Sequence, residues 1–252
     1  MKIVLKIAFL GTRYCGYQVQ PNGVTVQQKL NEAAKDLFGY DCDVVGCSRT
    51  DSGVHANEFC VALNKRGESG LPTSIAPERI VMAMNARLPA DISVLSARAA
   101  EDSFHPRYDV KYKEYVYLIW NKRSRDPFLE GRCWHCPRPI GDEGLENMRR
   151  AAALLVGRQD FASYMAADSK IKDSIRTVYE AEVTESDGLI RFRVSADGFL
   201  YNMVRIFTGT LMDVAYGRID PEEITDITRA KDRRKAGSTA PPEGLYLNKV
   251  VY

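Results

Sequence analysis

Long apolar runs are missing from this sequence of 252 residues, and no stretch is long and apolar enough to cross a membrane. The N-terminal residues 1–6 alternate in polarity and lack the apolar block of a signal peptide. Low-complexity tracts are also absent, and 45% hydrophobic with 27% charged residues is the composition of a globular protein. We therefore expect a cytoplasmic protein that buries a substantial core.

Residues that bind metals or act as nucleophiles are few or poorly spaced. The three histidines, at positions 55, 105 and 135, have no serine pattern near them, so a hydrolytic triad has no support. The six cysteines lack a framework spacing, which indicates reduced thiols. Cys133 and Cys136 have CxxC spacing, but no second pair completes a structural zinc site. Pro137 and Pro139 forbid the helix that follows a thioredoxin-like motif, and we expect no metal or cofactor.

A glycine-rich segment near the N-terminus needs a separate interpretation. Gly11 and Gly16 have the spacing of a phosphate-binding loop, but the lysine and hydroxyl residue that would follow are missing. This excludes a nucleotide-triphosphate site. We expect instead a turn after the first strand whose side chains are exposed for stacking or hydrogen bonding, namely Arg13, Tyr14, Tyr17 and Gln18.

Hydrophobic periodicity predicts the same order of elements twice. In the first half, strands are expected at about 3–9, 42–47, 58–64 and 91–98, and helices at 25–38 and from residue 77. In the second half, strands are expected at 112–120, 176–185, 189–196 and 245–251, and helices at 142–156, 201–216 and from residue 220. Each half reads β-α-β-β-α-β, the ferredoxin-like arrangement. We predict an α+β fold of two tandem ferredoxin-like or RRM-like halves, residues 1–105 and 106–252, with antiparallel sheets joined across a central cleft and helices on one face.

The net charge of +2 says little about partners, but basic residues cluster in three places. The clusters are Lys122, Arg123 and Arg125; Lys170, Lys172 and Arg176; and Lys231, Arg233, Arg234 and Lys235. Each is either solvated surface or part of a side that faces an anion.

Residues 48–56 form the segment with the clearest chemical potential. They lie in the connection between two expected strands, where a loop can carry chemistry on a rigid sheet. Arg49 and Asp51 are two residues apart, so both point to one side in extended backbone. A carboxylate beside a guanidinium stays ionised, which a nucleophile or base needs. Asp-Ser-Gly is also typical of an ordinary turn, so spacing alone leaves both interpretations open.

The segment resembles the Arg-Thr-Asp-x-Gly-Val-His-Ala signature of the tRNA pseudouridine synthase A family. Further blocks are similar to that family at residues 9–18, 104–108, 113–117, 199–205 and 239–247, so the likeness covers nearly the whole chain. The chain departs from the family pattern at four positions, where Leu10 replaces an acidic residue, Tyr17 a tryptophan, Ser48 a glycine and Ser52 an alanine. None of these departures removes a catalytic group.

The resemblance implies an isomerase that converts uridine to pseudouridine in the anticodon arm of tRNA, around positions 38–40. It implies no cofactor and a homodimer whose two subunits grip one tRNA. By position, Asp51 would be the nucleophile, Tyr115 would stack on the target uracil, and Arg205 would be the ion-pair partner of Asp51. Arg49 would help to hold the target nucleotide out of its stack. The expected RNA-binding set also contains Arg13, Tyr14, Gln18 and His55.

Two other interpretations use the same fold. Paired RRM-like sheets could belong to a non-catalytic RNA-binding protein, although no match to the aromatic RNP1 pattern is found. A duplicated ferredoxin-like protein could also bind a small metabolite. Without the signature, Tyr115 would be a core aromatic and Arg205 an ordinary surface residue. Fold alone does not separate these functions.

Overall fold

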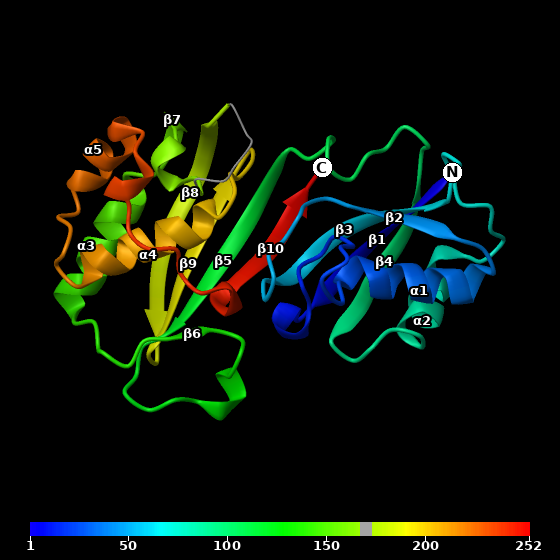
Figure 1. Cartoon of the computed structure of the whole chain (residues 1–252), viewed down its shortest axis with the longest axis horizontal. Helices are drawn as coiled ribbons and strands as arrows, with labels where there is room; N and C mark the ends of the chain where they lie inside the picture. Colours follow the sequence, from blue (N-terminus) through cyan, green and yellow to red (C-terminus); the bar gives the residue numbers. More distant parts are fainter. Residues whose placement is uncertain (167–172) are drawn as a thin grey trace. The chain divides into compact units, whose positions relative to one another are not determined.

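The computed structural model of the chain describes residues 1–166 and 173–252 and divides into two compact units (Figure 1). The first unit comprises Met1–Lys111 and Tyr246–Tyr252, and the second comprises Tyr112–Leu245. Lys170 and Lys172, which belong to one of the basic clusters, lie outside the described residues. Among the described residues, no helix combines the length and the apolar character needed to cross a bilayer.

The first unit follows the predicted order β-α-β-β-α-β, which confirms that prediction. Its elements are β1 (Lys2–Phe9), α1 (Val26–Phe38), β2 (Cys42–Gly46), β3 (His55–Lys65), α2 (Pro77–Asn85) and β4 (Ile92–Ala100), with a 3-10 turn η1 (Gly11–Arg13) after β1. The strands lie in the order β4-β1-β3, and β2 pairs with β3, all antiparallel. This is the ferredoxin-like strand order. Strand β10 (Leu245–Val251) adds a short parallel pairing to the start of β3.

Local sequence explains where the helices of the first unit begin and end. Thr25 caps α1, because its hydroxyl accepts a hydrogen bond from the backbone N of Gln28 at 3.2 Å. The helix stops at Gly39, whose φ of 77° is a left-handed conformation that favours glycine. Pro77 opens α2 at a first-turn position, where the missing N–H costs nothing. The helices bury one face each, formed by Val26, Leu30, Ala33 and Ala34 in α1 and by Ile80 and Met84 in α2.

The second unit is also a sheet with helices. Its strands are β5 (Tyr112–Trp120), β6 (Trp134–His135), β7 (Gly157–Asp160), β8 (Ile175–Ser186) and β9 (Leu189–Ala196). Its helices are α3 (Asp142–Ala153), α4 (Met203–Ala215) and α5 (Glu223–Ala230), with 3-10 turns η2 (Pro127–Leu129), η3 (Ala162–Tyr164), η4 (Arg233–Lys235) and η5 (Pro242–Gly244). The sheet has the order β5-β9-β8-β7 with antiparallel pairing, and β6 pairs parallel to β5. The strands expected at 176–185 and 189–196 are confirmed as β8 and β9, which form a hairpin that turns at Asp187 and Gly188, both with positive φ.

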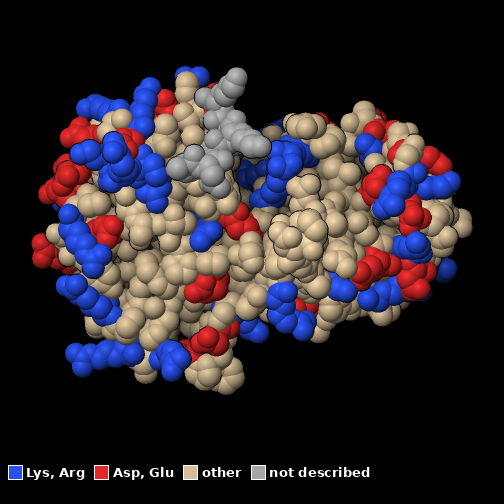
Figure 2. Space-filling view, viewed as in Figure 1, with Lys and Arg blue, Asp and Glu red and all other residues tan. Residues whose placement is uncertain are grey.

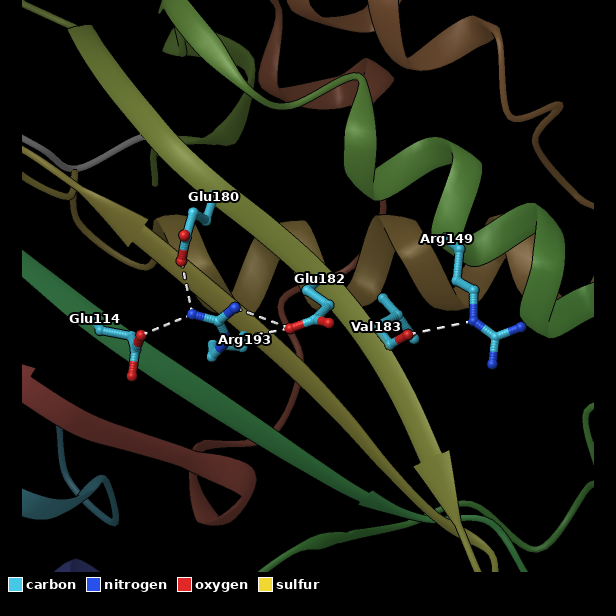
Figure 3. Close-up of polar contacts among 6 residues, drawn as sticks. All are labelled: Glu114, Arg149, Glu180, Glu182, Val183 and Arg193. Carbon is cyan, nitrogen blue, oxygen red and sulfur yellow. Dashed lines mark hydrogen bonds and ion pairs between the residues drawn. The ribbon is translucent and has the colours of Figure 1, made fainter.

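One face of this sheet is apolar and the other is charged. Phe192 and Val194 of β9 are fully buried. Helices α3 and α4 contact each other, and α3 also contacts β8 (Figure 1). On the alternate positions of β9, Arg193 instead contacts three glutamates of the neighbouring strands (Figure 3). This alternation is the period-two pattern expected when helices cover a single face of an antiparallel sheet.

The structure differs from the sequence prediction mainly in the second half of the chain. The helix expected at 142–156 ends at Ala153, and β7 follows from Gly157, where only a helix stop was expected. Hydrophobic periodicity does not predict β7, because residues 157–160 contain no apolar side chain to alternate. The C-terminal strand, expected in the second half, groups largely with the first unit through its pairing to β3. The division of the sequence after residue 105 stays a prediction.

Candidate active site

Asp51 lies in the connection between β2 and β3 of the first unit and is half-buried. The backbone N of Val54 donates to the carbonyl of Asp51 at 3.2 Å, which closes a turn over Gly53. Gly53 has a φ of 81°, a conformation that favours glycine, so the turn depends on the glycine of the signature. The Asp-Ser-Gly sequence is therefore a turn, and this turn is what presents Asp51.

The N-terminal segment 10–18 holds this connection in place through backbone atoms. The carbonyl of Tyr14 accepts a hydrogen bond from the N of Gly53 at 3.3 Å and another from the hydroxyl of Ser52 at 3.2 Å. The N of Tyr17 donates to the carbonyl of Thr50 at 3.3 Å. The residues on both sides of Asp51 are thus tied to the same neighbouring segment.

Gly11 and Gly16, whose spacing resembles that of a phosphate loop, have a packing role. A Cβ on Gly16 would lie 2.4 Å from the carbonyl oxygen of Thr50, and the φ of Gly16 is 76°. A Cβ on Gly11 would lie 2.0 Å from the carbonyl oxygen of Val54. Only glycine lets the two segments approach this closely. The two glycines therefore serve the Asp51 connection.

His55 is fully buried at the start of β3. Its Nδ1 accepts a hydrogen bond from the backbone N of Gly11 at 2.8 Å, and its ring lies 4.6 Å from that of Tyr246. The ring has no exposed surface, and its place in the expected RNA-binding set stays a prediction. Its contacts fix the end of the signature against the N-terminal segment and β10.

The side chains expected to be exposed on the first unit fall into two groups. Arg13 and Gln18 are exposed as expected, and Arg49 of the signature is exposed as well. Tyr14 and Tyr17, in contrast, are 5% and 2% exposed, so the expectation that both are open for stacking is wrong. Tyr17 is buried because its ring stacks on Phe59 at 4.4 Å, and its hydroxyl donates to the carbonyl of Val44. Burial of this phenol raises its pKa well above the usual range.

Asp91 is a residue of this region that sequence reasoning missed. Its Oδ1 accepts a hydrogen bond from the hydroxyl of Tyr14 at 2.6 Å, and its Oδ2 accepts one from Nε of Arg13 at 2.8 Å. Burial, and then the bond to Asp91, raise the pKa of Tyr14. A signal existed in the sequence, because the predicted ferredoxin-like order puts the fourth strand beside the first. In the structure Ile92 pairs with Phe9, which brings Asp91 to the segment after β1.

Tyr115 belongs to the second unit, in the middle of β5 and opposite Val194 of β9. Only 7% of its surface is exposed. The ring of Phe199 meets it edge-on, with 4.9 Å between ring centroids. Such a pair fixes the orientation of the Tyr115 ring, because edge-to-face contact is a preferred aromatic geometry.

Arg205 lies in the first turn of α4 and is half-buried, not an ordinary surface arginine. Its Nε donates to the carbonyl of Ala240 at 2.8 Å, and its Nη1 donates to Oδ1 of Asn202 at 2.8 Å. The backbone N of Ala240 donates in turn to the carbonyl of Arg205 at 3.1 Å. Asn202 is the residue directly before the helix and has a φ of 60°. The guanidinium is therefore held in a defined position.

Residues of the C-terminal block 239–247 form hydrogen bonds with β5 and α4 of the second unit. The hydroxyl of Tyr117 donates to the carbonyl of Pro241 at 2.6 Å, and burial raises the pKa of that phenol.

Burial also raises the pKa of Cys133 to about 11 and that of Cys136 to about 12. Both thiols are therefore protonated at neutral pH and poor nucleophiles.

The basic clusters differ in how far their charge is compensated. In the C-terminal cluster, Lys231 pairs with Asp160 at 2.8 Å and Arg234 with Asp232 at 2.8 Å. Such pairs favour the interpretation of that cluster as solvated surface. In the cluster after β5, Lys122 lies over the ring of Trp120 at 5.1 Å. On the face drawn in Figure 2, acidic and basic side chains are interspersed over each unit.

Comparison with known proteins identifies the class to which this fold and these blocks belong. The model of a family described as tRNA pseudouridine synthase matches residues 6–109 and 151–252. A relative from Thermoanaerobacter sp. (strain X514) is 43% identical over 250 residues, which are 99% of each chain. A relative from Bacillus subtilis (strain 168) is 40% identical over 254 residues, covering 100% of this chain and 99% of the relative. The chain belongs to the tRNA pseudouridine synthase family, which confirms the resemblance found in its sequence blocks. Both relatives carry the name tRNA pseudouridine synthase A.

Proposed function

We propose that this chain isomerises uridine to pseudouridine in tRNA. The observation that carries the proposal is the family match over most of the chain, which includes the intact Arg49-Thr50-Asp51 core of the signature. In the reaction the N1–C1′ bond of a uridine breaks, the base turns, and C5 bonds to C1′. The proton on C5 is lost and N1 becomes protonated. Atoms and electrons balance without an external acceptor.

In this proposal Asp51 is the nucleophile, Tyr115 stacks on the uracil, and Arg205 is the ion-pair partner of Asp51. Support comes from how each group is held. The turn that carries Asp51 is tied on both sides to the N-terminal segment, and the ring of Phe199 meets that of Tyr115 edge-on. The Arg205 guanidinium donates to the Ala240 carbonyl and to Oδ1 of Asn202. Groups that are fixed before substrate binds need little reorganisation during the reaction. The approach of the three groups to one another is part of the proposal.

The uridine has to leave the helical stack before its C1′ and C5 can be reached. Arg49 and Arg13 are exposed cations on the first unit and would contact phosphates beside the extruded nucleotide, while Gln18 offers an exposed amide. Their exposure supports this role, because phosphate contacts supply most of the affinity for a nucleic acid. The target lies in the anticodon arm, at positions 38–40.

Two further parts of the proposal concern the protein in the cell. We take the active form to be a homodimer that grips one tRNA with both subunits, in the cytoplasm. The free state of all six cysteines supports a reducing compartment. A non-catalytic RNA-binding protein is not favoured, since the full-length relatives carry the name of an enzyme.

The test is release of tritium from tRNA labelled at uracil C5. We expect the wild-type chain to release tritium and Asp51→Asn to release none, while a gel shift shows that both bind tRNA. Asp226→Asn is the matched control, because the Asp226 side chain is 81% exposed on α5 and loses the same charge. Release by Asp51→Asn at the wild-type rate would refute the assignment of the nucleophile.

A further inference from the structure

Resting on the proposed function, we propose that Asp91 is a positioning residue for Asp51. It acts through Tyr14, whose phenol binds Asp91 and whose carbonyl holds the turn that carries Asp51. Asp91 is far from that turn in the sequence, and it lies in none of the short sequence blocks on which the resemblance to the family was based.

Asp91 is itself held firmly by the sheet of the first unit. Asp91 immediately precedes β4, and its carbonyl accepts a hydrogen bond from the backbone N of Leu10 at 2.9 Å. The next residue, Ile92, pairs with Phe9 across the sheet. The Asp91 side chain is only 12% exposed. Its carboxylate is therefore fixed to the central sheet of the first unit.

Both oxygens of the carboxylate are used. Oδ1 accepts the hydrogen bond of the Tyr14 hydroxyl at 2.6 Å. Oδ2 accepts from Nε of Arg13 at 2.8 Å and lies 2.6 Å from its Nη2. The Arg13 side chain is 71% exposed, so solvent screens its ion pair and the contribution of that pair is small. Tyr14 as a whole is only 5% exposed, and we therefore take its bond to Asp91 as the one that positions the segment.

Tyr14 transmits this position to the turn. The residue is 5% exposed, which confines its side chain, and its own carbonyl accepts from Gly53 N and Ser52 Oγ. Those two donors are the residues that directly follow Asp51 in the chain. A shift of the Tyr14 phenol away from Asp91 would therefore move the acceptor on which the turn depends. Misplacement of a reacting group by about 1 Å can cost roughly 100-fold in rate.

Asp91→Asn is the direct test, because the substitution keeps the size of the side chain. It turns one acceptor oxygen into an NH2 donor, which then faces the donor of Tyr14 or of Arg13. Tyr14→Phe removes only the phenol oxygen and is the milder second variant. We expect each to lower kcat for tritium release about 10- to 100-fold, with KM for tRNA within about twofold. The double variant should be no slower than the slower single one, because both changes break the same link.

Asp36→Asn is the matched control in the same unit. Asp36 lies on α1 with a 70% exposed side chain, and it also pairs with an arginine, Arg87, at 2.6 Å. We expect this variant to keep the wild-type kcat. A general loss of structure would lower the melting temperature of Asp91→Asn and of Tyr14→Phe, whereas lost positioning changes kcat in variants that remain folded at the assay temperature.

Amide hydrogen exchange of Gly53 gives a second readout that does not depend on activity. Its N–H is protected by the Tyr14 carbonyl, so exchange should be at least about 10-fold faster in Asp91→Asn and in Tyr14→Phe than in the wild type. An inactive wild type would refute the proposed function, and Gly53 exchange would still decide the role of Asp91. The inference is overturned if folded Asp91→Asn or Tyr14→Phe keeps the wild-type kcat, if their effects multiply in the double variant, or if Gly53 exchange is unchanged.

Discussion

Replacing Arg193 by glutamine should destabilise the second unit more than any other single change on the charged face of its sheet. Arg193 is on β9, and its guanidinium contacts glutamates on both neighbouring strands (Figure 3). Nη1 lies 3.0 Å from Glu114 of β5 and 2.6 Å from Glu180 of β8. Nη2 lies 2.9 Å from Glu182 of β8. One cation thus compensates three carboxylates, and these contacts raise the pKa of Arg193.

The size of the effect follows from the exposure of the three carboxylates. The side chains of Glu180 and Glu182 are 57% and 53% exposed, so each pair contributes about 0.2–1 kcal/mol. Glu114 is only 13% exposed, and a hydrogen bond to a charged group there contributes about 1.5–3 kcal/mol. Without the guanidinium the three carboxylates also repel one another. We expect Arg193→Gln to lower the free energy of unfolding by about 2–5 kcal/mol.

Urea unfolding followed by tryptophan fluorescence measures this change in the relevant unit. Both tryptophans of the chain, Trp120 and Trp134, lie in the second unit, so their signal reports that unit. Arg191→Gln is the matched control, because Arg191 is exposed on the same face of β9 opposite the uncharged Leu118 and Thr184. Its effect should stay within about 0.5 kcal/mol. A loss for Arg193→Gln no larger than that of the control would refute the reasoning.

Three further changes test other parts of the structure. Oγ1 of Thr50 is buried without a hydrogen-bond partner among the described residues. Thr50→Val should therefore raise the free energy of unfolding of the first unit by about 1 kcal/mol in thermal or urea denaturation, and a decrease would contradict this. The hydrogen bond from Lys231, and to a smaller extent that from Ser174, lowers the pKa of Asp160. The ionised carboxyl therefore stabilises the fold above its unfolded pKa of about 4, and this stabilisation is lost as the pH falls through the lowered pKa. Asp160→Asn should therefore be less stable than the wild type at pH 7, and the difference should shrink as the pH falls below about 4; a pH-independent difference would count against the pair. The affinity for tRNA in gel shifts should fall steeply with added salt, and a flat response would exclude phosphate contacts as its main source.

Much of the fold could be predicted because its signals are local. The apolar faces of α1 and α4, the Thr25 cap and the alternation in β9 each lie within one element. Strand β7 could not be predicted in this way, since its four residues are polar and form a strand only by pairing with β8. The place of β10 likewise depends on a pairing with β3 that no local pattern encodes.

For the candidate site, the signature located Asp51, but the groups that support it are distant in the sequence. Tyr14 and Asp91 are 77 residues apart, and their contact follows from the neighbouring positions of β1 and β4. The burial of Tyr17 could not be read from its neighbours, because Phe59, the ring on which it stacks, is on another strand. Polar residues around a turn predict exposure in general, and in this segment long-range packing prevails over that tendency.

The most direct test of the proposed isomerase is nucleoside analysis of an unmodified tRNA transcript after incubation with the wild-type chain. We predict a nucleoside with the mass of uridine and the chromatographic behaviour of pseudouridine, which maps to positions 38–40 in the anticodon arm. Asp51→Asn should produce none under the same conditions. If the folded wild-type chain binds the transcript but leaves every uridine unchanged in a panel of tRNAs, the proposed function is wrong.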